Sequence, residues 1–194
     1  MASTHSAGGW RDRADLSMAG LGLLSGILSV SWGTSRDIGT AWLEPIALVF
    51  GLAPELLPIG LFFGAVIGLS VWRWTGRMLE VPAVIITTMY AWSAAIQVAI
   101  RTQRHVDDDP HLIAASLGAG AVGAGITHLG CAVFARELRR PMRIALTVAV
   151  GAVAGLLLYL SQRKFVDERL LYLVWQPAVA FTIGMGLVGR AQQA

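Results

Sequence analysis

The few side chains that could do chemistry in this sequence lie mostly inside long apolar runs. Thr87, Tyr90, Ala94, Gln97 and Arg101 are spaced three or four residues apart along one such run and its end, so they share a face if the segment is helical. Polar groups in a membrane helix tend to face the bundle interior or a water-filled cavity. This face is therefore predicted to line a permeation pathway. The alternative is hydrogen bonding between helices, with Arg101 at the membrane surface.

Two further polar residues extend the pathway hypothesis. His128 is the only histidine within an apolar run, and because imidazole titrates near neutral pH, it could gate a pathway or contact a ligand. Gln176 precedes Pro177, which removes a helical hydrogen bond, and broken helices at membrane depth often bind substrate. The alternatives are a histidine hydrogen-bonded to a neighbouring helix and an ordinary proline kink.

A short polar segment between two apolar runs contains side chains that bind metals. His105, Asp107, Asp109 and His111 alternate along it, so in an extended chain they would point the same way, as a divalent metal site requires. The alternative is a helix N-terminus, in which Asp109 is the N-cap and Pro110 the first helical residue. The neighbouring arginines would then pair with the acids.

The residues that most membrane enzymes and cofactor sites require are missing. No apolar run contains a lysine for a retinal Schiff base or an aspartate for an intramembrane protease, and one histidine cannot supply paired haem ligands. Cys131 is the only cysteine, so no intrachain disulfide can form. No acid within a run could orient His128 to activate Cys131 as a nucleophile. We expect neither an enzyme nor a bound cofactor.

The composition indicates an all-α, multi-pass membrane protein with a single domain over residues 1–194. Of the 194 residues, 55% are hydrophobic and 14% are charged, whereas soluble domains carry about 25% charged residues. So much apolar surface requires a lipid bilayer as its main partner. No basic run is interleaved with aromatic residues, so a nucleic-acid partner is not expected.

Six runs without charge are predicted to cross the membrane, because spanning takes about 20 apolar residues. The first run could instead be a cleaved signal peptide, although the acids that precede it favour a retained helix. Segment 41–53 is too short to span, so it is expected to lie in the interface, to re-enter, or to extend the second span. The predicted spans are residues 16–35, 56–72, 81–100, 112–135, 144–162 and 170–189.

The basic residues predict where the protein resides and how it is oriented. Loop 135–143 carries four arginines, and loops rich in Arg and Lys stay on the cytoplasmic side, so both termini are expected in the cytoplasm. All basic residues except Lys164 are arginines, which suggests a GC-rich bacterial genome. The expected location is the cytoplasmic (inner) membrane of a bacterium.

Small residues spaced four apart predict close helix packing. In lipid, such faces let helix backbones approach each other, either within one chain or between copies in a homo-oligomer. The residues are Gly60, Gly64 and Gly68 in the second span, and Gly151 and Gly155 in the fifth.

Two functions fit these features. The first is a small channel or transporter for an ion or small solute, which the polar face, the kinked sixth span and His128 favour. The alternative is an accessory or assembly subunit bound to a partner in a larger membrane complex, which the small size and the missing catalytic chemistry favour. A membrane enzyme is the least supported class.

Overall fold

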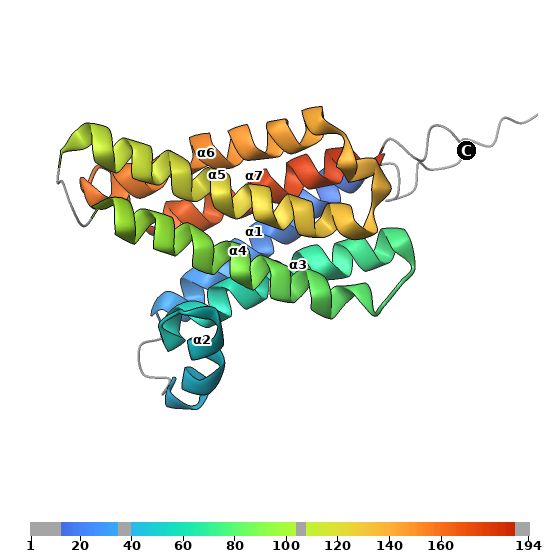
Figure 1. Cartoon of the computed structure of the whole chain (residues 1–194), viewed down its shortest axis with the longest axis horizontal. Coiled ribbons are helices and arrows are strands. Elements are labelled where there is room, and N and C mark those ends of the chain that lie inside the picture. Colours follow the sequence, from blue (N-terminus) through green and yellow to red (C-terminus); the bar gives the residue numbers. More distant parts are fainter. Residues whose placement is uncertain (1–12, 35–39, 104–107, 189–194) are drawn as a thin grey trace, which may run out of the picture.

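A computed structural model describes residues 13–34, 40–103 and 108–188, and these ranges contain helices and turns but no strand. The all-α prediction is therefore confirmed. Figure 1 shows long helices lying side by side, with one short helix to the side of the bundle. The long helices are α1 (Ala14–Thr34), α3 (Leu57–Thr75), α4 (Glu80–Gln103), α5 (Asp109–Phe134), α6 (Pro141–Gln162) and α7 (Arg169–Val188). The shorter elements are η2 (Ala41–Leu43), α2 (Glu44–Phe50), η3 (Pro54–Leu56) and η4 (Arg136–Arg139).

The six long helices form a closed ring in chain order. Each helix packs against its neighbours in sequence, and α1 completes the ring by packing against both α3 and α7. The most extensive interfaces join α1 to α7, α5 to α6, and α4 to α5. Helices α3, α5 and α7 alternate with the others around the ring and have the largest shares of buried residues.

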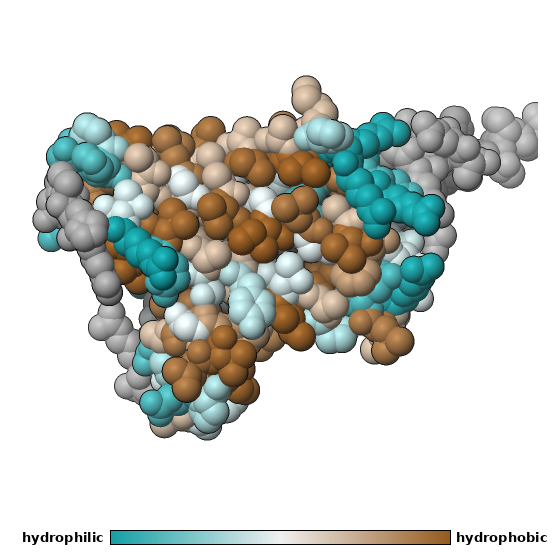
Figure 2. Space-filling model, in the orientation of Figure 1, coloured by the Kyte–Doolittle hydropathy of each residue, from teal (hydrophilic) through white to brown (hydrophobic). Residues whose placement is uncertain are grey.

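All six long helices are long and apolar enough to cross a membrane, so the chain is a multi-pass membrane protein. Figure 2 shows apolar surface along the middle of the bundle and hydrophilic surface gathered at its two ends. The six predicted spans agree with these helices to within a few residues. Helix α1 packs along α7.

The two ends of the bundle differ in charge. Among the described residues, the end at which α3 and α5 finish carries seven basic and three acidic side chains. The opposite end, where α4 finishes and α5 begins, carries four basic and six acidic side chains. Each end is therefore electrostatically distinct, which is the asymmetry that orients membrane proteins.

Segment 41–53 forms a separate short helix, α2, and does not extend the second span. Gly51, at φ 61°, ends α2 in a left-handed conformation that glycine adopts without strain. Ser93 of α4 donates a hydrogen bond to the carbonyl of Phe50, and the Gln97 amide donates to the carbonyl of Gly51 over 3.4 Å. Polar side chains of α4 thus satisfy carbonyls that the end of α2 leaves unpaired.

The predicted glycine faces pack within the chain. Gly60, Gly64 and Gly68 of α3 lie against α4, while Gly151 and Gly155 of α6 lie against α5. At the second interface the backbones of Gly120, Gly151 and Gly155 touch, because none of them carries a Cβ atom. These glycines therefore serve intrachain packing, and an oligomer would have to use other surfaces.

The α5–α6 contact yields the first prediction. In Gly120→Ala, the new methyl group would overlap the carbonyl oxygen of Gly151 and lie 2.9 Å from the Cα of Gly155. Because backbone atoms cannot move aside cheaply, we expect a loss of roughly 1–3 kcal/mol in stability. The measurement is thermal unfolding of the protein in nanodiscs.

The matched control is Gly20→Ala on α1, where an added Cβ meets nothing within 4 Å. We expect this variant to melt at the wild-type temperature or above it, because alanine favours a helix more than glycine does. Equal melting temperatures for both variants would contradict tight α5–α6 packing.

Candidate functional site

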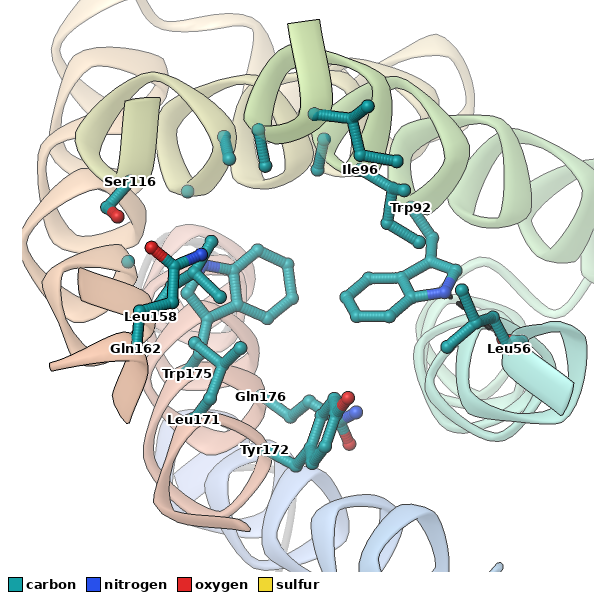
Figure 3. Close-up of a pocket in the computed structure, with 16 residues that line it drawn as sticks. Leu56, Trp92, Ile96, Ser116, Leu158, Gln162, Leu171, Tyr172, Trp175 and Gln176 are labelled. Carbon is teal, nitrogen blue, oxygen red and sulfur yellow. Dashed lines mark hydrogen bonds between the residues drawn. The ribbon is translucent and has the colours of Figure 1, made fainter. Parts of the chain in front are cut away.

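A cavity of about 260 Å³ lies between α4, α5, α6 and α7, toward the end where α4 finishes and α5 begins. Figure 3 shows side chains of these helices surrounding it, with Leu56 of η3 at one side. Ile96, Leu158 and Leu171 contribute apolar surface, and no charged residue lines the cavity within the described part of the chain. The site therefore suits an uncharged molecule with a large apolar portion.

Two tryptophans from different helices line opposite sides of the cavity. The rings of Trp92 and Trp175 face each other across it in Figure 3. The Trp92 indole donates to the carbonyl of Leu56 over 3.1 Å, and the Trp175 indole donates to that of Gly151 over 3.2 Å. Because both rings are fixed by hydrogen bonds, the cavity wall is preformed.

Gln176 and Ser116 are the buried polar side chains at the cavity. The Gln176 side chain accepts a hydrogen bond from Ser25 over 2.6 Å and donates one to Ser29 over 3.1 Å, both on α1. Ser116 is fully buried, and its hydroxyl has no hydrogen-bond partner among the described residues. Gln176 is therefore committed to joining α7 to α1, whereas the hydrogen-bonding capacity of the Ser116 hydroxyl is unused within the described residues.

A second, smaller cavity of about 10 Å³ is lined in part by the same two tryptophans. Trp92, Trp175 and Gln176 line both cavities. The smaller one is completed by α3 and by the hydroxyl-bearing residues Thr88 of α4 and Thr127 of α5. Both tryptophans thus border a larger apolar space and a space the size of one water molecule.

The structure does not bring the predicted pathway residues of α4 to the cavity. Thr87 packs on Gly130 and donates to its own helix at the carbonyl of Ala83 over 2.8 Å. Tyr90 stacks on Phe50 of α2 with ring centroids 4.9 Å apart. The Gln97 amide binds the end of α2, and Arg101 is exposed. Of the residues predicted to line a pathway, Gln176 alone lies at the cavity.

The inner face of α4 is instead the next one around the helix. Val84, Thr88, Ala91 and Ala95 are buried and spaced three or four residues apart. Because this face is mostly small and apolar, the positions of polar residues in the sequence do not reveal it. Thr88 beside Thr87 was its one polar marker in the sequence.

His128 is fully buried at the end of the bundle away from the cavity. Its Nδ1 lies 2.8 Å from the Thr147 hydroxyl of α6, and its Nε2 lies 2.9 Å from the carbonyl of Leu138. Arg143 reinforces the same junction by donating to the carbonyls of Glu137 and Gly186. Both ring nitrogens are thus committed to holding the η4 turn against α5 and α6, and neither is bonded to Cys131.

Only part of the predicted metal site is described. His105 and Asp107 lie outside the described residues. Asp109 forms an ion pair with Arg163, and the His111 ring lies 2.5 Å from Asp108. The described residues contain no group of three metal-binding side chains.

The alternative for this segment, a capped helix N-terminus, is what the structure shows, but the N-cap residue differs from the predicted one. The N-cap of α5 is Asp108 rather than Asp109, because Asp108 has an extended backbone and accepts a hydrogen bond from the His111 amide over 3.1 Å. Hydrogen bonds from the His111 side chain and amide lower the pKa of the Asp108 carboxyl. Asp108 therefore stabilises the start of α5 as a carboxylate.

The chain matches no protein-family model, no curated protein and no solved structure. Similarity therefore assigns it neither a family nor an activity. Function must be inferred from the two cavities and the buried polar groups around them.

The His128 junction yields the second prediction. His128→Leu would leave the buried carbonyl of Leu138 without its donor, so we expect a loss of roughly 1–3 kcal/mol in stability. His128→Gln should keep most of the stability, because its amide nitrogen can replace Nε2 as the donor. Thermal unfolding of both variants measures the difference. If leucine were tolerated as well as glutamine, His128 would not be holding the η4 turn.

Proposed function

We propose that this membrane protein is a small transporter or channel for an uncharged solute with an apolar body and at least one hydrogen-bonding group. The observation that carries the proposal is the preformed cavity of about 260 Å³ within the bundle. An apolar cavity of about 150 Å³ already holds a benzene molecule, so this one has room for a small solute.

The lining of the cavity selects against ions. Moving an ion into apolar surroundings without a partner is costly, and no charged side chain lines the cavity among the described residues. A fully apolar solute would cross the bilayer unaided, so a solute that needs this protein carries a polar group. The unpaired hydroxyl of Ser116 offers that group a hydrogen bond.

The charge asymmetry supports an orientation for transport. The end that carries seven basic residues among those described would face the cytoplasm of a bacterial cell, with the chain termini on that side. The cavity would then lie in the outer half of the membrane.

A second function, an accessory subunit of a membrane complex, draws on the surface of α2. Figure 1 shows α2 lying apart from the ring, and Figure 2 shows apolar surface on it. The exposed apolar side chains of α2 and of the preceding η2 are Trp42, Ile46, Leu48 and Val49. Either lipid or a partner protein would cover this face.

The third prediction tests the cavity. Ala99 lines it, so Ala99→Leu would fill part of its volume and slow entry of a solute. We expect a several-fold loss of protein-dependent flux of a small uncharged solute that has an apolar part, such as 1,2-propanediol, in proteoliposomes, measured by stopped-flow light scattering. The matched control is Ala149→Leu, because Ala149 is exposed on the outer surface of α6.

Equal flux in both variants and the wild type would overturn a transport role for this cavity. So would a wild type that conducts no more than protein-free liposomes across a panel of small uncharged solutes.

The fourth prediction separates the two functions. Native mass spectrometry of the protein, extracted gently from its own membrane, should show it alone or with copies of itself. A stoichiometric foreign subunit that no longer co-purifies with the Leu48→Ser variant would instead favour the accessory role, because the apolar side chain of Leu48 on α2 is 79% exposed.

A further inference from the structure

The larger cavity has aromatic rings on three sides. Trp92 and Trp175 line opposite sides, and Figure 3 shows the ring of Tyr172 on a third. The Tyr172 and Trp92 rings have centroids 6.0 Å apart, and Trp175 packs on Phe63 of α3 with centroids 5.5 Å apart. These neighbours and the hydrogen bonds of both indoles fix the rings, so an aromatic site exists before a ligand binds.

The tryptophans offer a ligand apolar and π surface but no hydrogen-bond donor. An indole has a single polar group, its N–H. In both tryptophans this group already donates to a backbone carbonyl, of Leu56 and of Gly151 respectively. An aromatic ring gains more from such a surface than a saturated ring of the same size, because its positive edge can meet the negative face of an indole. The tryptophans therefore favour an aromatic occupant.

The volume of the cavity suits a single ring. It is about 260 Å³, whereas an apolar cavity of about 150 Å³ already holds a benzene molecule. The small residues Ala119, Gly120 and Gly155 are part of the lining on α5 and α6, and they leave this volume open. One aromatic ring with a small substituent therefore fits.

A cation is the other kind of ligand that aromatic side chains attract. Moving a cation out of water is costly unless an opposite charge or hydrogen bonds compensate for the lost hydration. No acidic side chain lines the cavity within the described residues. The lining therefore favours a neutral aromatic ligand over a quaternary ammonium ion.

Gln162 is the polar side chain at the mouth of the cavity. It is the last residue of α6, it is exposed, and it forms no hydrogen bond with another described residue. Figure 3 shows its amide on the same side of the cavity as Ser116. Trp175 lines the cavity from the adjacent helix, six residues after the start of α7 and so about 9 Å from that end. Because the Ser116 hydroxyl is buried, a ligand that enters from this end meets the Gln162 amide first.

We propose that the larger cavity binds a neutral aromatic alcohol of one ring, with the ring between Trp92 and Trp175 and the hydroxyl at the Gln162 amide. The amide can both donate to a hydroxyl and accept from it. Binding stands on the aromatic lining and on Gln162. This inference narrows the solute class of the proposed function, and only the transport of such a ligand rests on that function.

Competition for the wild-type protein tests the aromatic class. The probe is para-fluorophenol, whose binding to the protein in nanodiscs is followed by fluorine NMR, with empty nanodiscs as the background. The competitors are phenol, cyclohexanol and choline. Cyclohexanol carries the same hydroxyl as phenol on a saturated ring of similar size. We expect phenol to displace the probe at a concentration about 2–10-fold lower than cyclohexanol, and choline to leave it bound.

Two alanine positions show whether the probe occupies this cavity. Ala99→Leu fills part of the cavity and should remove most of the probe binding. The matched control Ala149→Leu lies on the outer surface of α6 and should bind the probe like the wild type. Equal probe binding by both variants would contradict the site.

A comparison of two probes locates the hydroxyl. Fluorobenzene differs from para-fluorophenol by the hydroxyl alone. The wild type should bind para-fluorophenol about 2–10-fold more tightly than fluorobenzene, because the hydroxyl gains a hydrogen bond. Gln162→Leu should remove this difference, and its exposed place at the end of α6 leaves the packing of the bundle unchanged. A difference that survives in Gln162→Leu would overturn the placement of the hydroxyl.

The outcomes separate this inference from the transport function. Equal displacement by phenol and cyclohexanol would overturn the aromatic class, and stronger displacement by choline would assign the cavity to a cation instead. Either result could accompany a normal flux of 1,2-propanediol, which would keep transport and reject the aromatic ligand. Selective binding of phenol by a protein that conducts no solute would keep the ligand and reject transport.

Discussion

Inside a bilayer there is no water to satisfy a buried polar group, and this constraint explains where most polar side chains of the protein lie. Gln176 joins α7 to two serines of α1, and His128 joins α5 to α6 and to the η4 turn. The indoles of Trp92 and Trp175 donate to backbone carbonyls of η3 and α6. Because lipid is as apolar as the helix surfaces, the hydrophobic effect does not hold the helices together. These hydrogen bonds join them in one particular arrangement.

Glycine also contributes to the helix arrangement, because without a Cβ atom it lets neighbouring side chains and backbones come close. A Cβ atom added to Gly60 would lie 3.1 Å from the Trp92 side chain. One added to Gly123 would lie 3.2 Å from the ring of Trp175. Where glycine meets glycine, as between α5 and α6, the backbones touch. The cavity thus lies beside tightly packed helix pairs, so its shape is held by rigid neighbours rather than by loops.

The polar residues of α4 show why a site could not be read from polarity alone. The face with Tyr90 and Gln97 was predicted to point inward. It instead packs against the short helix α2, and Gln97 donates a hydrogen bond to a carbonyl at the end of α2. The inner face passes through Thr88, one residue away from the predicted Thr87. A shift of one residue turns a helix position by about 100°, which separates a residue bonded within its own helix from one that faces a cavity.

The sequence by itself determined the class of the protein, the six spans and their bounds, because a run of about 20 apolar residues has one stable form in a bilayer. It also showed the glycines on which the helices pack. The tertiary structure alone decided which face of each helix turns inward, which glycines meet, and where the cavities lie. Lipid is as apolar as the bundle interior, so hydropathy hardly distinguishes the two faces of a helix. The fit of side chains and the hydrogen bonds between helices select the inner face, and both exist only once the bundle has formed.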